Sequence, residues 1–115
     1  MTPSAREGDL FGDVPDDVPD EILEVLARGE GVRIERIVSR GQRSPDGFWY
    51  DQDEDEWVLV VAGAAVLELA DGRRVSLGAG DWMHLPARER HRVHWTDPDR
   101  NTVWVAVFWR PEADV

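Results

Sequence analysis

The sequence contains no cysteine, and this absence removes several kinds of chemistry at once. Disulfide bonds, thiolate metal ligands and cysteine nucleophiles all need a thiol, so none of them can operate in this chain. Any bound metal would be held by nitrogen and oxygen atoms. The serines also lie outside any Gly-x-Ser-x-Gly sequence, so nothing indicates the nucleophile of a hydrolase triad.

Positive charge is scarce as well. The chain has 13 lysine and arginine residues against 24 aspartate and glutamate residues, which gives a formal net charge of -11. Such a chain repels the phosphate backbone of nucleic acids and the surface of anionic lipid membranes. We therefore expect neither nucleic acid nor a membrane as a partner.

Long apolar runs are missing too. The most apolar segment, residues 57–70, is short, is interrupted by Gly63 and contains Glu68. The first residues show no basic stretch followed by an apolar run, as a secretion signal would. We expect a cytoplasmic protein.

What the sequence does contain is a β pattern that fits one domain of 115 residues. From residue 31 onward, short runs rich in Val, Ile, Trp and Phe alternate with Gly, Pro and Asp, which is typical of an all-β barrel or sandwich. The pair Asp71-Gly72 predicts a tight hairpin, and neighbouring strands should pair antiparallel. Strands are predicted at residues 32–39, 47–52, 57–61, 64–69, 73–77, 82–85, 91–95 and 102–109.

The first thirty residues differ from the rest. Residues 1–20 are rich in Pro, Gly and Asp and predict an irregular arm lying on the domain. The segment DEILEVLARG, from Asp20, has acidic residues first, Arg28 near its end and Gly29 after it, which predicts a short helix of about two turns. The predicted organisation is an arm and helix over residues 1–30, a barrel over 31–110 and a tail over 111–115.

Two separated motifs in the barrel region resemble those of the cupin superfamily. The positions in register are Gly47, Glu56 and Gly63 in the first motif and Gly80, Pro86 and His91 in the second. The resemblance implies an antiparallel cupin β-barrel of the double-stranded β-helix or jelly-roll type. With the predicted segment near the N-terminus, the expected fold class is all-β with one short helix.

The chain departs from the cupin pattern at four positions. Tyr50 and Gln52 occupy the two histidine positions of the first motif. In the second motif, Arg88 stands where a glycine is expected and Trp95 where an asparagine is expected. The resemblance nevertheless implies that the side chains at positions 50, 52, 56 and 91 surround one point inside the barrel.

The residues themselves indicate what such a site could do. Residues two apart in a strand share a face, so Tyr50 and Gln52 should point to one side, and Val93 and Trp95 should share the face of His91. An inward Glu56 needs a cation or hydrogen-bond donors around it. We predict catalytic roles for Tyr50, Glu56 and His91, with Glu56 or His91 as general acid or base and Tyr50 as a second proton donor.

Whether the site holds a metal is open at this point. Related cupins bind iron, manganese, nickel, zinc or cobalt with three histidines and one glutamate. Here a phenol and an amide replace two imidazoles, and both are weaker ligands for these ions. One alternative is a divalent transition metal (Zn, Ni, Fe, Mn or Co) on Gln52, Glu56 and His91, and the other is a metal-free polar cluster of the same residues.

Other polar and aromatic residues have simpler interpretations. The acidic run over residues 51–56 predicts a solvated loop with only Glu56 turned inward, and His84 and His94 should face away from the pocket. The chain has six tryptophans, and outward apolar residues such as Trp57 and Leu59 predict a homodimer.

Two functions follow as alternatives. The first is an enzyme acting on a small molecule by metal-assisted or acid/base chemistry, such as oxygenation, isomerisation or a lyase reaction. The second is a non-catalytic module without metal that binds a small ligand. Fold resemblance alone does not choose between them.

Overall fold

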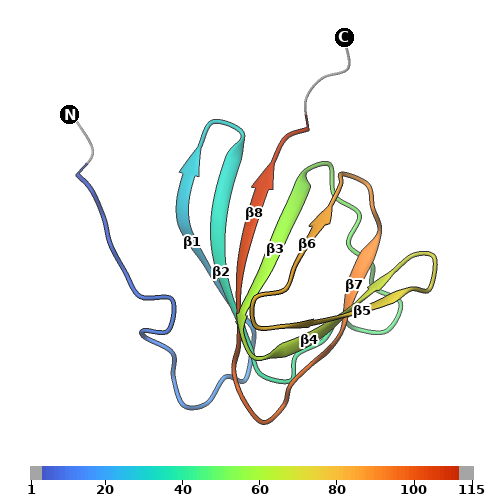
Figure 1. Cartoon of the computed structure of the whole chain (residues 1–115), viewed down its shortest axis with the longest axis horizontal. Helices are drawn as coiled ribbons and strands as arrows, with labels where there is room; N and C mark the ends of the chain where they lie inside the picture. Colours follow the sequence, from blue (N-terminus) through green and yellow to red (C-terminus); the bar gives the residue numbers. More distant parts are fainter. Residues whose placement is uncertain (1–3, 112–115) are drawn as a thin grey trace.

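The computed structural model describes residues 4–111 as two antiparallel sheets that enclose one core (Figure 1). The larger sheet has the strand order β1 (Ile22–Gly29), β2 (Val32–Ser39), β8 (Thr102–Trp109), β3 (Asp55–Ala62) and β6 (Trp82–Leu85). The smaller sheet has the order β5 (Arg74–Gly78), β4 (Ala64–Leu69) and β7 (His91–Thr96). The all-β antiparallel fold predicted from the sequence is confirmed.

The core forms where the inward faces of the two sheets meet. Alternate residues of β3, β4 and β8 are buried, among them Val58, Leu67 and Trp104 at 2%, 2% and 4% exposure. Their intervening neighbours point outward, as the two-residue period of a strand requires. The sheets therefore share one apolar interior, with polar side chains buried at both of its ends.

The helix predicted near the N-terminus is wrong, because that segment forms strand β1. It pairs antiparallel with β2 from Ile22↔Val38 to Gly29↔Val32, with one bulge at Leu26. The two strands are joined through Glu30 and Gly31, and Gly31 has a φ of 72°, which suits a tight hairpin. Without this pairing the edge of β2 would be open, so the tertiary pairing overrides the local helical pattern.

Residues 4–21 form the irregular arm that the sequence predicted. The arm is fastened to the sheet by Arg36, whose Nη1 donates to the carbonyl oxygens of Leu10 and Gly12 at 3.2 and 2.6 Å. Further along, the Gln42 side chain donates to the Val18 carbonyl at 2.7 Å, and Val18 is buried. Most of the predicted tail, residues 112–115, lies outside the described residues. Within residues 4–111 there is no helix long and apolar enough to cross a bilayer.

The predicted strand over residues 47–52 is absent, and a long loop takes its place between β2 and β3. Within it, Tyr50 pairs with His91 of β7, with a Tyr50 N to His91 O distance of 2.7 Å and a His91 N to Tyr50 O distance of 3.2 Å. The Arg88 amide donates to the Gln52 carbonyl at 2.8 Å. These bonds hold positions 50 and 52 on one side of the loop without a regular strand.

A bulge in β7 changes the face of its last residues. Leu67 pairs with Val93 and Val66 with Trp95, so His94 is the extra residue. As a result Trp95 is 39% exposed and Thr96 is buried. The expectation that Trp95 shares the face of His91 is therefore wrong.

Candidate functional site: a polar cavity inside the barrel

A cavity of about 300 Å³ lies between the sheets at the end where the 40–54 loop crosses. Apolar walls come from β2, β3, β4, β6, β7 and β8, including Trp104 and Phe108. The polar residues in its lining are Glu21, Arg33, Glu35, Tyr50, Gln52, Glu56 and His91. All four residues that the cupin resemblance placed around one point, at positions 50, 52, 56 and 91, line the same space.

Glu56 is the centre of the polar cluster. It lies near the start of β3 and is 9% exposed. Its Oε1 accepts a hydrogen bond from Gln52 Nε2 at 3.1 Å and lies 3.5 Å from His91 Nε2. An amide and an imidazole thus converge on one carboxylate oxygen, which offsets part of the cost of burying it.

His91 is held in a defined orientation. Its Nδ1 lies 3.0 Å from the Glu89 carbonyl oxygen, which can only accept, so Nδ1 carries a hydrogen. In a neutral His91 the lone pair of Nε2 would then face the Glu56 carboxylate and be repelled by it. A proton on Nε2 removes this repulsion. Burial lowers the pKa of His91, but the Glu56 carboxylate and the Glu89 carbonyl outweigh it and raise the pKa above its ordinary value.

Tyr50 covers the histidine at the mouth of the cavity. Its ring stacks on the His91 ring with 5.2 Å between centroids and an interplanar angle of 23°. Burial raises the pKa of Tyr50, and the negative charges of Glu21 and Glu56 raise it further. Tyr50 is therefore a neutral phenol, able to donate a hydrogen bond over the whole physiological range.

A second group of polar residues in the lining, at positions 21, 33 and 35, was not predicted from the sequence. Arg33 and Glu35 alternate with Ile37 along β2, and all three line the cavity, so the two-residue period of that strand was a usable signal. Glu21 could not be found in this way because it lies in the first turn of the segment that we expected to be a helix.

The main chain keeps the left-handed conformation of the cupin glycine positions even where another residue replaces the glycine. Gly63 has a φ of 92°, and a Cβ added there would lie 2.5 Å from Thr102 Cα. Arg88, at the position of an expected glycine, has a φ of 70°, in the left-handed region that glycine favours. The main chain thus follows the motif while this side chain does not.

The donor set does not fit a resident transition metal. It offers one imidazole and one carboxylate, and among residues 4–111 no group of three or more His, Cys, Asp or Glu side chains is placed to hold an ion. The Gln52 amide nitrogen is directed at Glu56, and the raised pKa of Tyr50 opposes the phenolate that a metal would need. Two strong ligands with two weak ones favour a metal-free cluster.

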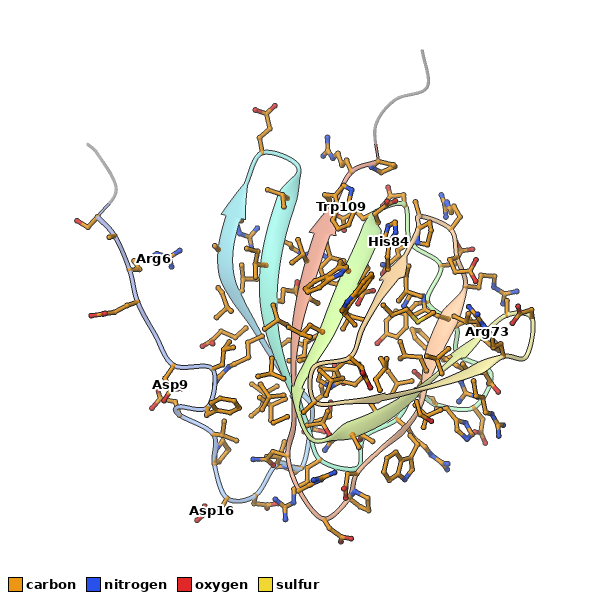
Figure 2. All side chains as sticks on the ribbon, viewed as in Figure 1. Arg6, Asp9, Asp16, Arg73, His84 and Trp109 are labelled. Carbon is orange, nitrogen blue, oxygen red and sulfur yellow. The ribbon has the colours of Figure 1, made fainter. Side chains whose placement is uncertain are left out.

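The other candidate residues lie outside the cavity. His84 Nε2 is 3.1 Å from Asp55 Oδ2, and the His84 ring stacks on Trp109 with 5.5 Å between centroids (Figure 2). His94 lies at the bulge of β7 and is not part of the lining. In the acidic run Asp51 and Asp53 are exposed and Glu56 is buried, as predicted. Glu54 and Asp55, however, are half-buried and pair with Arg33 and His84, so the run is only partly a solvated loop.

Comparisons with known proteins agree with this architecture. A family model described as a cupin domain matches residues 34–108. A protein from Ralstonia eutropha JMP134, provisionally described as a mannose-6-phosphate isomerase, is 50% identical with a TM-score of 0.89, and the alignment covers 93% of this chain and 100% of that one.

More distant structures share the fold alone. A cupin superfamily protein from Desulfitobacterium hafniense DCB-2 is 17% identical with a TM-score of 0.74, covering 95% of this chain and 94% of that one. A conserved protein of unknown function from Streptococcus pyogenes is 18% identical with a TM-score of 0.73, covering 97% and 93%. No curated protein matches the chain. The cupin-domain match spans most of the two-sheet barrel, and on that ground the chain belongs to the cupin family.

Proposed function

We propose that the chain binds a small polar molecule in the cavity and transfers a proton on it, with His91 as acid or base and Glu56 as its partner. One observation carries this proposal. His91 Nε2 and Glu56 Oε1 lie 3.5 Å apart beside a cavity of about 300 Å³, and the far side of the imidazole is anchored to a carbonyl. Such an anchored, buried pair can hold a proton and release it to a ligand.

The neighbouring residues have supporting roles in this proposal. Gln52 donates to Glu56 Oε1 and fixes the carboxylate in front of His91. Tyr50, a neutral phenol stacked on the imidazole, supplies a second hydrogen-bond donor at the mouth. The arrangement suits reactions that begin by removing a proton next to a carbonyl group, because the base and a donor for the developing oxyanion lie on the same cavity wall.

Similarity favours isomerisation within this class. The Ralstonia protein is provisionally described as an isomerase of a sugar phosphate, and its chain is aligned over its whole length with this one. Interconversion of an aldose and a ketose moves a proton between neighbouring carbons, which is work for an acid/base pair. The proposed proton transfer relies on the side chains alone, because the donor set does not fit a metal. The alternative function is a non-catalytic module that binds a small ligand.

Deuterium exchange tests the proposal and does not require the reaction product to be identified. The protein is incubated in D₂O with a panel of small aldoses, ketoses and hydroxy-aldehydes, and loss of the proton next to the carbonyl is followed by NMR. Wild type should exchange at least one compound. His91→Gln and Glu56→Gln should reduce the exchange by about 100-fold or more, the usual contribution of one acid/base group.

A matched control is His84→Gln, which removes a histidine from the outer face and should leave exchange at the wild-type level. Binding of a panel compound in the cavity without any exchange would contradict the catalytic proposal and support the binding module. Equal rates of exchange in wild type and His91→Gln would show that His91 takes no part in the proton transfer.

We also propose that this protein is a cytoplasmic homodimer. The outer face of the larger sheet carries Trp57 and Trp82, whose rings lie 6.0 Å apart, and Trp82 is 59% exposed. An exposed apolar patch of this kind supports an interface with a second copy. Light scattering at micromolar concentration should give twice the chain mass, and Trp82→Lys should give a monomer.

A further inference from the structure

We propose that the cavity selects its ligand by charge: it accepts uncharged or cationic polar molecules and rejects phosphorylated or carboxylated ones. The inference rests on the proposed function only in locating the ligand at this cavity. It is carried by the balance of charges in the lining and by the contacts that already occupy the one guanidinium there.

Carboxylates outnumber cations in the lining. Glu21, Glu35 and Glu56 line the cavity, and within the described part of the chain Arg33 is the one arginine or lysine among the lining residues. His91 is the remaining group able to carry positive charge, and its Nε2 faces Glu56. An entering anion therefore meets a surplus of negative charge at short range.

The charge of Arg33 is already balanced by two carboxylates. Its Nε donates to Glu35 Oε2 at 2.7 Å and its Nη1 to Glu54 Oε1 at 2.6 Å. The guanidinium also lies over the Phe108 ring, 4.1 Å from its centroid. A phosphate would have to share this cation with two carboxylates, and both would remain beside the phosphate.

Glu21, which directly precedes β1, adds a third carboxylate to the cavity lining. Burial raises the pKa of Glu21, and the contact of its Oε2 with Ser39 Oγ is long, at 3.4 Å. Glu21 and Glu56 both raise the pKa of Tyr50, so the two carboxylates act on the same region of the cavity. Hydroxyl and ammonium groups can donate to these oxygens, whereas a dianionic phosphate and an ionised carboxylate cannot.

Binding of small molecules of different charge tests the inference, with Tyr50 as the reporter. It is the one tyrosine of the chain, so a ¹³C-labelled tyrosine ring gives a single NMR signal from the cavity. The probes are a fragment set with equal shares of cationic, uncharged and anionic polar molecules, and it includes D-mannosamine, D-mannose and D-mannose 6-phosphate. These three hexoses share one ring and differ in charge.

Uncharged and cationic probes should shift the Tyr50 signal saturably, and anionic probes should bind at least tenfold more weakly. In wild type the affinity for D-mannose should exceed that for D-mannose 6-phosphate. Glu21→Gln should reduce this affinity ratio about tenfold, because one nearby negative charge is removed. Asp16→Asn is the matched control: it removes the same charge from the arm, outside the lining, and should leave the affinity ratio unchanged (Figure 2).

Each outcome has a distinct meaning. Tighter binding of anionic than of uncharged probes at the Tyr50 signal would overturn the charge selection and leave the proposed function standing. An affinity ratio that falls equally in Glu21→Gln and Asp16→Asn would also overturn it. The net charge of the protein, and not the charges in the cavity, would then explain the weaker binding of anions. If no probe of any charge shifts Tyr50, the proposed function fails and this inference fails with it.

Discussion

The two ends of the barrel bury polar groups of different kinds. At the end where β3 turns into β4, the polar residues are hydroxyls: Ser39, Thr96 and Thr102 are 1%, 1% and 0% exposed. Thr102 Oγ1 donates to the Ala64 carbonyl at 3.1 Å and Thr96 Oγ1 to the Gln42 carbonyl at 2.6 Å. At the opposite end the buried polar residues are ionisable, with Glu56 at 9% and His91 at 4%.

This difference separates the stabilising end from the functional one. A buried hydroxyl that finds a carbonyl is close to neutral or favourable for stability, so the hydroxyl end closes the barrel at little cost. A buried carboxylate and imidazole are costly, and apolar residues could fill the same volume. Their presence beside an open cavity is therefore better explained by chemistry than by folding, and the two ends should respond differently to substitution.

The largest effect should come from Gly63→Ala at the hydroxyl end. The new Cβ would lie 2.5 Å from Thr102 Cα and 2.7 Å from the Asn101 carbonyl oxygen, at a φ of 92°. Backbone atoms cannot move aside easily, so overpacking adds to backbone strain. We expect a loss of at least about 3 kcal/mol in the free energy of unfolding, measured by urea denaturation.

Gly72→Ala is the control for this prediction. Gly72 has a similar φ of 90°, but nothing lies within 4 Å of the position of an added Cβ. It should therefore lose only the strain of the left-handed conformation, about 1 kcal/mol. Equal losses in both variants would show that steric contact at the hydroxyl end does not stabilise the fold.

At the charged end we expect a smaller, pH-dependent effect from Glu56→Gln. The pKa of His91 is raised, so its contribution to stability is fully present below the ordinary value of 6.5 and is lost as pH rises through the folded value. Glu56→Gln removes the charged partner and should lower the free energy of unfolding by about 2 kcal/mol at pH 5.5 and by much less at pH 9. Urea denaturation at both pH values measures this.

An NMR titration of the histidine ring protons provides the second measurement. In Glu56→Gln the His91 signal should titrate at lower pH than in wild type, since the carboxylate no longer favours the imidazolium. A His91 titration that Glu56→Gln leaves unchanged would contradict a proton-sharing pair.

Third, Gln52→His should create a metal site at the charged end. It adds an imidazole beside Glu56 and His91, and imidazole is a far better ligand for nickel, cobalt and zinc than an amide. We expect nickel to bind at least tenfold more tightly than to wild type, about 1.4 kcal/mol, measured by calorimetric titration. Equally tight binding to both proteins would show that the native donor set already suffices for a metal.

Much of the fold could be predicted because the signals were local. Alternating apolar residues and the turn at Asp71-Gly72 located the strands over residues 32–39, 64–69, 82–85 and 102–109 with the bounds that the structure has. The resemblance to the two cupin motifs also implied that Glu56 and His91 share one space, and both line the cavity. What that space does was not predictable, because the same four side chains suit binding, acid/base chemistry and metal coordination.

The errors arose where pairing between distant segments decided the structure. Strand β1 has the acidic start and basic end of a short helix and becomes a strand because β2 offers it an edge. The bulge at His94 turns Trp95 outward, and no local pattern in β7 indicates it. Glu21 enters the cavity only as a consequence of the β1 pairing, so its contribution to the charge of the lining was hidden as well.

The smallest predicted effect is at Arg88, where sequence and backbone disagree. Its φ of 70° costs an L-residue about 1–2 kcal/mol, whereas glycine adopts this conformation readily but loses more entropy on folding. Its ion pair with Asp51, at 3.2 Å between exposed side chains, contributes little. Arg88→Gly should therefore raise the free energy of unfolding by about 0.5–1 kcal/mol.

The same substitution should not affect the cavity. The Arg88 amide donates to the Gln52 carbonyl, and glycine keeps that amide, so ligand binding measured at the Tyr50 signal should not change. Arg88→Ala is the control: it keeps the backbone strain and should not raise the free energy of unfolding. If Arg88→Ala stabilised the protein as much as Arg88→Gly, the arginine side chain and not the backbone conformation would be the source of the destabilisation.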